Sequence, residues 1–163
     1  MEEIIRMQEN LLLIRRTVGW TAEEFGERIG VTRQTINNIE SGRNKLTKTK
    51  YIAMRSVLDA EIIQAPEDTE MLKVLLDVLV DNPEKYSTDK REELLAKANL
   101  MTPSILAGTT SRADVSKEWM KVAGAVVGAG ALLGPLGVSA GIAAVNVWLA
   151  KSVAKTKKKS KKE

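Results

Sequence analysis

Apolar residues near the start of the chain recur at the spacing of a helix that is buried along one side. Leu11, Ile14 and Val18 follow one another at intervals of three and four residues, which places them on one helical face. Gly19 comes next, and glycine commonly ends a helix in the left-handed conformation. The pattern predicts a first helix from about residue 10 to residue 18.

Two short helices with a tight turn between them are predicted after this glycine. Thr21 precedes AEEFGERI, and Glu24 three residues later completes the capping box of a helix N-terminus. Gly30 ends this second helix, and Thr32 caps a third, RQTINNIE, while Gly26 permits close approach of the two. The residues expected to face inward are Ala22, Phe25, Ile29, Ile36 and Ile39.

A turn and a fourth helix complete this part of the chain. SGRN at 41–44 is rich in turn-forming residues. Residues 48–60 are predicted to be helical, with Ile52, Met54, Val57 and Leu58 on the apolar face. Two short helices joined by GVT at 30–32 are typical of a helix-turn-helix, so we expect residues 1–64 to form one domain.

Residues 65–118 indicate two further helices that serve as a connector. An amphipathic stripe lies in 71–79 and is broken at Asn82 and Pro83. A second helix is predicted from about residue 88 to 100, with an interruption at MTP (101–103) and a linker at AGTTSR (107–112). The apolar residues of the two helices are Met71, Leu72, Leu75, Leu76, Leu79, Leu94 and Leu95. Two interpretations stay open: dimerisation through the leucines, or a spacer that completes the core of the first domain.

Charge and composition narrow the classes of function. The net charge is +1 over residues 1–64, −4 over 65–118 and +7 over 119–163. Because the chain has no histidine and no cysteine, it lacks the commonest general base, the commonest metal ligands and any thiol nucleophile. We therefore expect no enzyme, no metal site and no cofactor. The acidic and mixed first residues also indicate that there is no secretory signal peptide.

Several carboxylates of the connector are candidates for catalytic groups or metal ligands. They lie among lysines on polar helix faces, which is the usual pattern of solvated side chains. We therefore expect the following residues to be solvated: Asp77, Asp81, Glu84, Glu92 and Glu93.

Residues 9–60 resemble the Cro/repressor-like (XRE-type) helix-turn-helix family. The resemblance is carried by TAEEF at 21–25, GVT at 30–32, QTI at 34–36 and IESG at 39–42. It implies that the third helix enters the major groove of double-stranded DNA. One departure is Ala22, where the family often has a glutamine that contacts phosphate.

The resemblance also implies roles for individual residues. The expected base contacts are Arg33, Gln34, Asn37 and Asn38, since Arg matches the acceptors of guanine, and Gln and Asn match the edge of adenine. The expected phosphate contacts are Thr21, Thr35, Arg43, Asn44, Lys45 and Lys48. Arg15 and Glu40 are expected to form a structural ion pair. A first domain with a charge of only +1 would bind DNA weakly alone, so a homodimer, a higher homo-oligomer or a second anchor is expected.

A run without any ionisable side chain extends from residue 122 to 149. It is longer than the ~18 apolar residues that mark a candidate membrane span. Tryptophans flank it, as at an apolar–water boundary, and glycines recur four apart, a spacing that lets helices approach closely in lipid. The residues of this membrane or assembly segment, 119–150, are Trp119, Gly124, Gly128, Gly130, Gly134, Pro135, Gly137, Gly141 and Trp148.

Two membrane geometries and one soluble alternative are open for this segment. A single helix would be about 42 Å long at ~1.5 Å per residue, and it would put the DNA-binding domain and the lysine-rich tail on opposite sides of a bilayer. A helical hairpin that turns at GPLG (134–137) keeps both on the cytoplasmic side, which the positive-inside rule favours. The soluble alternative is that the segment packs against protein in an oligomer. The tail, 151–163, is expected to be disordered and to suit anionic lipid headgroups or DNA phosphates.

The sequence thus predicts an all-α protein. It has an N-terminal Cro/repressor-like helix-turn-helix domain, a helical middle, and a C-terminal Gly/Ala-rich apolar helix or helical hairpin with a lysine tail. The predicted function is sequence-specific DNA binding by a transcriptional regulator, which is cytoplasmic or attached to the inner face of the cell membrane through residues 119–162. The alternative is a membrane or assembly protein that uses the helix-turn-helix as a protein-interaction module.

Overall fold

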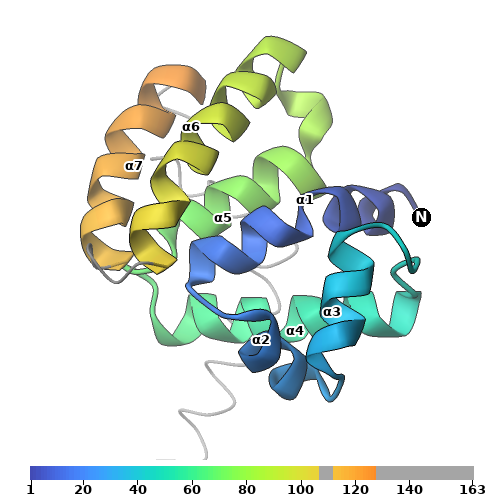
Figure 1. The fold of residues 1–163 in the computed structure, drawn as a ribbon. Coiled ribbons are helices and arrows are strands. Elements are labelled where there is room, and N and C mark those ends of the chain that lie inside the picture. The colour runs from blue at the N-terminus through green and yellow to red at the C-terminus, as the bar shows by residue number, and fades with distance from the viewer. Residues whose placement is uncertain (107–111, 128–163) are drawn as a thin grey trace, which may run out of the picture.

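The computed structural model describes residues 1–106 and 112–127, and these ranges contain helices and turns but no strand (Figure 1). The predicted all-α fold is confirmed. In chain order the elements are α1 (Glu2–Val18), α2 (Ala22–Ile29), α3 (Arg33–Glu40), α4 (Lys48–Gln64), α5 (Glu70–Leu76), the π-helical turn η1 (Asp77–Asp81), the 3-10 turn η2 (Pro83–Lys85), α6 (Thr88–Leu106) and α7 (Arg112–Val127). We call α1–α4 the head, and α5, η1, η2, α6 and α7 the bundle.

Helix α1 begins at Glu2 rather than near residue 10. Glu2 and Glu3 lie in its first turn, where carboxylates interact favourably with the helix dipole. Met7 is fully buried and continues the predicted apolar stripe toward the N-terminus. The other end of the helix is as predicted, because Gly19 ends it with φ 78°, in the left-handed region.

The helix-turn-helix has the predicted local geometry. The Thr21 hydroxyl accepts the backbone N–H of Glu24 at 3.1 Å, and the Glu24 carboxylate accepts the backbone N–H of Thr21 at 2.7 Å, so the capping box is complete. Gly30 ends α2 with φ 73°, and the Thr32 side chain caps α3. The two helices are therefore bounded by their own backbone and side-chain hydrogen bonds.

Gly26 brings α2 into direct contact with the backbone of the turn. A Cβ at this position would lie 2.6 Å from the carbonyl oxygen of Val31, and the Val31 N–H donates to the Gly26 carbonyl at 2.8 Å. Since real Cβ atoms do not approach an oxygen so closely, any larger residue would push the turn away from α2.

Helix α4 buries one row of side chains and exposes another. Met54, Leu58 and Ile62, spaced four residues apart, face the core. The prediction that Ile52 shares this face is wrong, because its side chain is 53% exposed. A residue two positions before Met54 lies about 200° around the helix from it, so only one of the two apolar rows can reach the core.

The bundle packs against α1, which separates it from α2 and α3 (Figure 1). Its leucine stripe is used within the chain: Leu72, Leu75 and Leu76 are at most 1% exposed. The stripe is therefore not a free surface for dimerisation. These helices extend the apolar core of the head, as the second interpretation has it, and dimerisation stays a prediction.

Helix α6 continues through Pro103 to Leu106, so the predicted interruption at residues 101–103 is wrong. A proline inside a helix removes one backbone hydrogen bond. Ala98 and Thr102, four residues apart, are buried and hold this part of α6 against the bundle, whereas Pro103 is exposed. Packing of the buried face outweighs the lost bond.

Helix α7 crosses the predicted boundary between residues 118 and 119. Its buried row is Val115, Trp119, Ala123 and Val126, and Trp119 is 0% exposed. Trp119 thus lies in the core of the bundle and not at an apolar–water boundary, which corrects the predicted start of the apolar segment. Gly124 also belongs to this helix.

The remaining predicted residues of that segment lie outside the described residues, as do most of the predicted linker and the whole lysine tail. They are Gly128, Gly130, Gly134, Pro135, Gly137, Gly141 and Trp148. In the part of the chain that the structure describes, no helix is both long enough and apolar enough to cross a membrane.

A half-buried ion pair joins the head to the bundle. Arg55 of α4 donates to both carboxylate oxygens of Asp81, each at 2.8 Å, and to Asp59 at 3.2 Å. Burial raises the pKa of Asp81, and the hydrogen bonds from Arg55 oppose that rise. Asp77 accepts the Tyr86 hydroxyl at 2.6 Å. The prediction that Asp77 and Asp81 are solvated is therefore wrong, because packing of η1 half-buries both carboxylates and pairs them with Tyr86 and Arg55.

Gly26→Ala tests the contact between α2 and the turn. We expect it to lower the free energy of unfolding by about 1–3 kcal/mol, the usual cost of overpacking, although alanine favours helix over glycine by up to ~1 kcal/mol. Urea unfolding followed by circular dichroism measures the change. The control is Glu27→Ala at the next, exposed position, and equal midpoints for the two variants would contradict the prediction.

Candidate nucleic-acid interface

Helix α3 presents its polar residues to solvent because its two isoleucines are buried. Ile36 and Ile39 are 0% and 1% exposed, and they fix the rotation of the helix against α1 and α2. Arg33 and Gln34 in the first turn are consequently exposed, and Asn37 and Asn38 are half-buried. These residues line the outward face of the helix that the family resemblance assigns to the major groove.

Two amides on this face are hydrogen-bonded to each other. The Gln34 side-chain N–H donates to the Asn38 side-chain oxygen at 2.9 Å, one helical turn away. One more pair of polar side chains, the hydroxyls of Thr32 and Thr35, lies 3.0 Å apart at the start of the helix. Each amide keeps further donor and acceptor capacity. The hydrogen bond therefore orients the two side chains and leaves them able to bond to a ligand.

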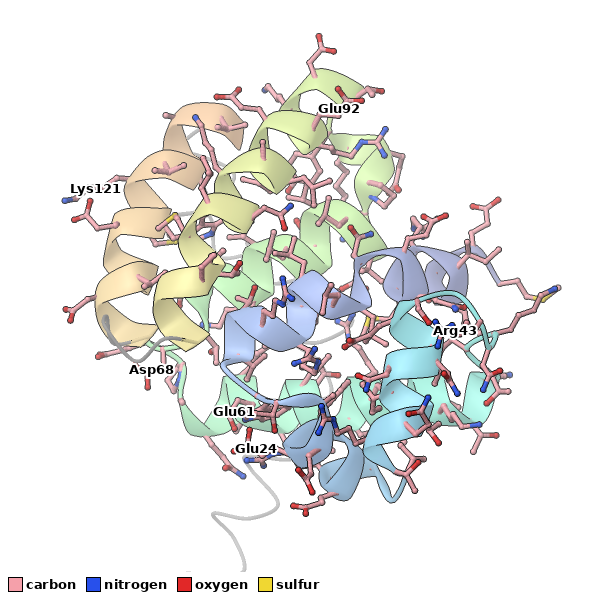
Figure 2. The ribbon with its side chains drawn as sticks, viewed as in Figure 1. Glu24, Arg43, Glu61, Asp68, Glu92 and Lys121 are labelled. Carbon is pink, nitrogen blue, oxygen red and sulfur yellow. The ribbon has the colours of Figure 1, made fainter. Side chains whose placement is uncertain are left out.

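The loop between α3 and α4 carries the exposed cations. It turns at Gly42, which has φ 74°, and it exposes Arg43, Asn44 and Lys45, while Lys48 begins α4. The Asn44 backbone N–H donates to the Asn38 carbonyl at 3.0 Å, which holds the loop against the end of α3. Figure 2 shows Arg43 beside α3, on the side of the molecule opposite Lys121 of α7.

Gln8 of α1 contacts the same loop, a role that the sequence pattern does not predict. Its amide N–H groups donate to the carbonyls of Ile39 at 2.9 Å and Asn44 at 2.8 Å, and its oxygen accepts the Leu46 N–H at 2.9 Å. In the sequence Gln8 is one polar residue among several in MEEIIRMQEN. No local signal marks it, because its partners lie more than thirty residues away.

Thr21 lies in a different electrostatic environment from the other predicted phosphate contacts. Its hydroxyl and its N–H are both engaged in the capping box with Glu24, and those bonds lower the pKa of the Glu24 carboxyl. Glu23 is exposed in the same helical turn. Two carboxylates thus stand beside the place where a phosphate would approach, and Ala22 contributes no polar group.

Arg15 and Glu40 form the ion pair that the resemblance implies. The Arg15 Nε and Nη2 atoms donate to the two oxygens of Glu40 at 2.6 and 3.0 Å, and Nη1 donates to the Trp20 carbonyl at 2.7 Å. Both charged side chains are less than 10% exposed. One guanidinium therefore ties together α1, the segment before α2, and the last residue of α3.

The structure brings some of the predicted site residues together and leaves others apart. The α3 residues and the adjacent loop residues share one region of the head, and Trp119 and Gly124 lie in α7, away from it. Among the residues that the structure describes, no group of three or more histidine, cysteine, aspartate or glutamate side chains has the arrangement of a metal site. The region offers amides, hydroxyls and cations, which is the chemistry that base edges and phosphates require.

Comparison with known protein families finds a match over the part of the chain that contains this region. The helix-turn-helix family model matches residues 11–62, which is roughly a third of the chain and spans α1 from Leu11 to near the end of α4. Comparisons with curated proteins and with solved structures found no match.

Arg15→Met tests whether the buried ion pair holds α3 in place. Removing one partner leaves the Glu40 carboxylate buried without its counter-charge, so we expect a loss of about 3–5 kcal/mol in the free energy of unfolding. Urea unfolding at neutral pH measures it. Arg16→Met, at the exposed neighbouring position, is the control.

Adding Glu40→Met to Arg15→Met sharpens this test. The second change removes the unpaired charge, and the double variant should recover at least about 1 kcal/mol. The pair contributes little if Arg15→Met loses less than about 1 kcal/mol, or if the double variant recovers no stability.

Proposed function

From the premise that residues 11–62 form a Cro/repressor-like, XRE-type helix-turn-helix segment, we propose that this protein is a sequence-specific DNA-binding regulator of transcription. The observation that carries the proposal is the outward face of α3, where exposed and half-buried polar residues stand over two fully buried isoleucines. We assign it a regulatory role and no enzymatic one.

The proposed base contacts divide by chemistry. Arg33 at the exposed start of α3 suits the O6 and N7 acceptors of guanine. Gln34, Asn37 and Asn38 suit the N6 donor and N7 acceptor of adenine. The hydrogen bond between Gln34 and Asn38 supports a joint role, because it orients the two amides before any base arrives.

The proposed phosphate contacts surround these residues. Arg43 and Lys45 have exposed cationic side chains on the loop, Asn44 lies between them, and Lys48 is the first residue of α4. Thr35 lies in the first turn of α3. Thr21 is the weakest member of the set, since carboxylates stand beside it.

The proposed active form contains more than one head. A head with a net charge of +1 neutralises few phosphates, and non-specific affinity for DNA is lower when fewer phosphates are contacted. Two heads on half-sites about 34 Å apart would double those contacts. Because the leucines of α5 are buried within one chain, the apolar residues that follow α7, 128–149, are a candidate for assembly instead.

The apolar run and the lysine tail are proposed to anchor the regulator at the inner face of the cell membrane. The absence of ionisable side chains over residues 128–149, the part of the apolar run that follows α7, supports this proposal, as do the seven lysines from 151 to 162. A hairpin that dips into one leaflet would leave the head and the tail in the cytoplasm together. Packing of the run against protein in an oligomer is the competing role.

The joint variant Arg33→Ala, Gln34→Ala tests sequence-specific binding. Duplexes selected from a random library by the full chain supply the operator, and fluorescence anisotropy measures affinity. With about 1–3 kcal/mol per bidentate contact, we expect the variant to lose roughly 100-fold or more on the operator and little on random duplex.

The matched control is Gln64→Ala, Lys85→Ala, which removes one amide and one cation at exposed positions outside α3 and its loop. It should bind as the wild type does. Unchanged operator affinity in the α3 variant, or a wild type that selects no duplex, would favour a protein-interaction module instead.

Membrane attachment is tested by fractionating cells that express the full chain or a chain ending at Val127. This end point keeps Trp119, Ala123 and Val126 in the bundle core, so the shorter chain is expected to remain folded. Only the full chain should sediment with membranes, and detergent rather than salt should release it. Recovery of both chains in the soluble fraction would reject the anchor, and their sizes would then report on assembly.

A further inference from the structure

The side chain of Gln8 uses its amide N–H groups and its oxygen on backbone at the end of α3 and in the loop that follows it. Both N–H groups donate, to Ile39 O at 2.9 Å and to Asn44 O at 2.8 Å, and its oxygen accepts from Leu46 N at 2.9 Å. Gln8 is half-buried on α1 and does not belong to the exposed polar face of α3. Its three bonds bind one helix of the head to both ends of the loop.

The three partners lie at the end of α3 and in the loop before α4. The carbonyl of Ile39, in the last turn of α3, also accepts the Gly42 N–H at 3.1 Å, so it joins Gln8 to the start of the turn. Asn44 and Leu46 lie in the loop before α4, and Leu46 is buried, so its side chain anchors the same point. The conformation of residues 41–46 is thereby fixed at its start, middle and end.

Glutamine is the side chain whose chemistry fits this position. Two donors and one acceptor are needed at the reach of a long side chain. Glutamate has no donor when ionised, lysine has no acceptor, methionine has neither strong group, and asparagine is shorter by one methylene.

The loop that Gln8 holds is the one that carries Arg43, Asn44 and Lys45. We propose that Gln8 is a positioning residue for DNA binding: it fixes the loop so that these side chains meet the DNA backbone without prior ordering. This inference rests on the proposed function, and it adds a residue that contacts neither base nor phosphate. Its signature is a loss of phosphate contacts with retained sequence preference.

Gln8→Met, of similar length and without the polar groups, tests the inference in the full chain. Affinity for a labelled random-sequence duplex and for the selected operator is measured over a range of salt concentrations. We expect about a tenfold loss on both duplexes, the scale of one charge-assisted contact. The slope of log affinity against log salt should shrink by about 1–2, at ~0.9 per phosphate.

The matched control is Asn10→Met. Asn10 is a half-buried amide on the same helix, but it donates only within α1, to Arg6 O at 2.8 Å. It should change stability without changing the salt slope. Should Gln8→Met fail to fold, Gln8→Asn keeps an amide too short to reach the loop and carries the same expectations.

A double-variant comparison separates positioning from general destabilisation. In a chain that already carries Arg43→Ala and Lys45→Ala, the loop has lost its cations, so Gln8→Met should reduce affinity no further. A second tenfold loss in that background would overturn the inference. So would a folded Gln8→Met chain with wild-type affinity and slope.

Hydrogen exchange of the Leu46 amide tests the positioning role of Gln8 separately from the proposed DNA binding. Gln8→Met should speed that exchange, since the amide loses its acceptor. If the wild-type chain binds no duplex while the amide is protected, the proposed function fails and the positioning role fails with it. If the wild type binds DNA and Gln8→Met leaves binding unchanged, the positioning role alone fails.

Discussion

The structure depends on the burial of α1 from two sides. On one side Gln8 and Arg15, seven residues apart, bond to α3 and the loop that follows it. On another side Arg6 donates to the Val80 carbonyl of η1 at 2.8 Å, and Leu13, also seven residues from Arg6, is buried. A helix with two packed faces cannot rotate to improve one contact without losing the other. The bundle and helices α3 and α4 of the head therefore pack against the same helix, α1.

Local signals were sufficient to predict the helix-turn-helix. Thr21, Gly30 and Thr32 act through hydrogen bonds or dihedral angles within a few residues, so their consequences can be read from the sequence around them. The buried pair Ile36 and Ile39 followed from helical spacing. For the same reason, the polar residues opposite this pair could be predicted as the outward face of α3.

The features that could not be predicted from the sequence depend on packing between residues that are distant along the chain. Two apolar rows of α4 were equally visible, and only contact with the rest of the core selects the row of Met54 over that of Ile52. Pro103 predicts a break because the cost of a proline in a helix is local, whereas the burial that outweighs this cost comes from contacts with other helices. Trp119 suggested an interface by its position beside an apolar run, and Gln8 gave no signal at all.

In the proposed complex with DNA, the contact at Gly26 would limit how far α2 and α3 can adjust to a duplex. Backbone meets backbone there, with Val31 O close to the glycine, so no side chain can change rotamer to alter the angle between α2 and α3. The reading surface consequently behaves as a rigid template, and the shape change falls to the nucleic acid. Base steps that bend or widen at low cost would be preferred even where no side chain touches them. An operator for this chain would thus be defined partly by the mechanics of the double helix.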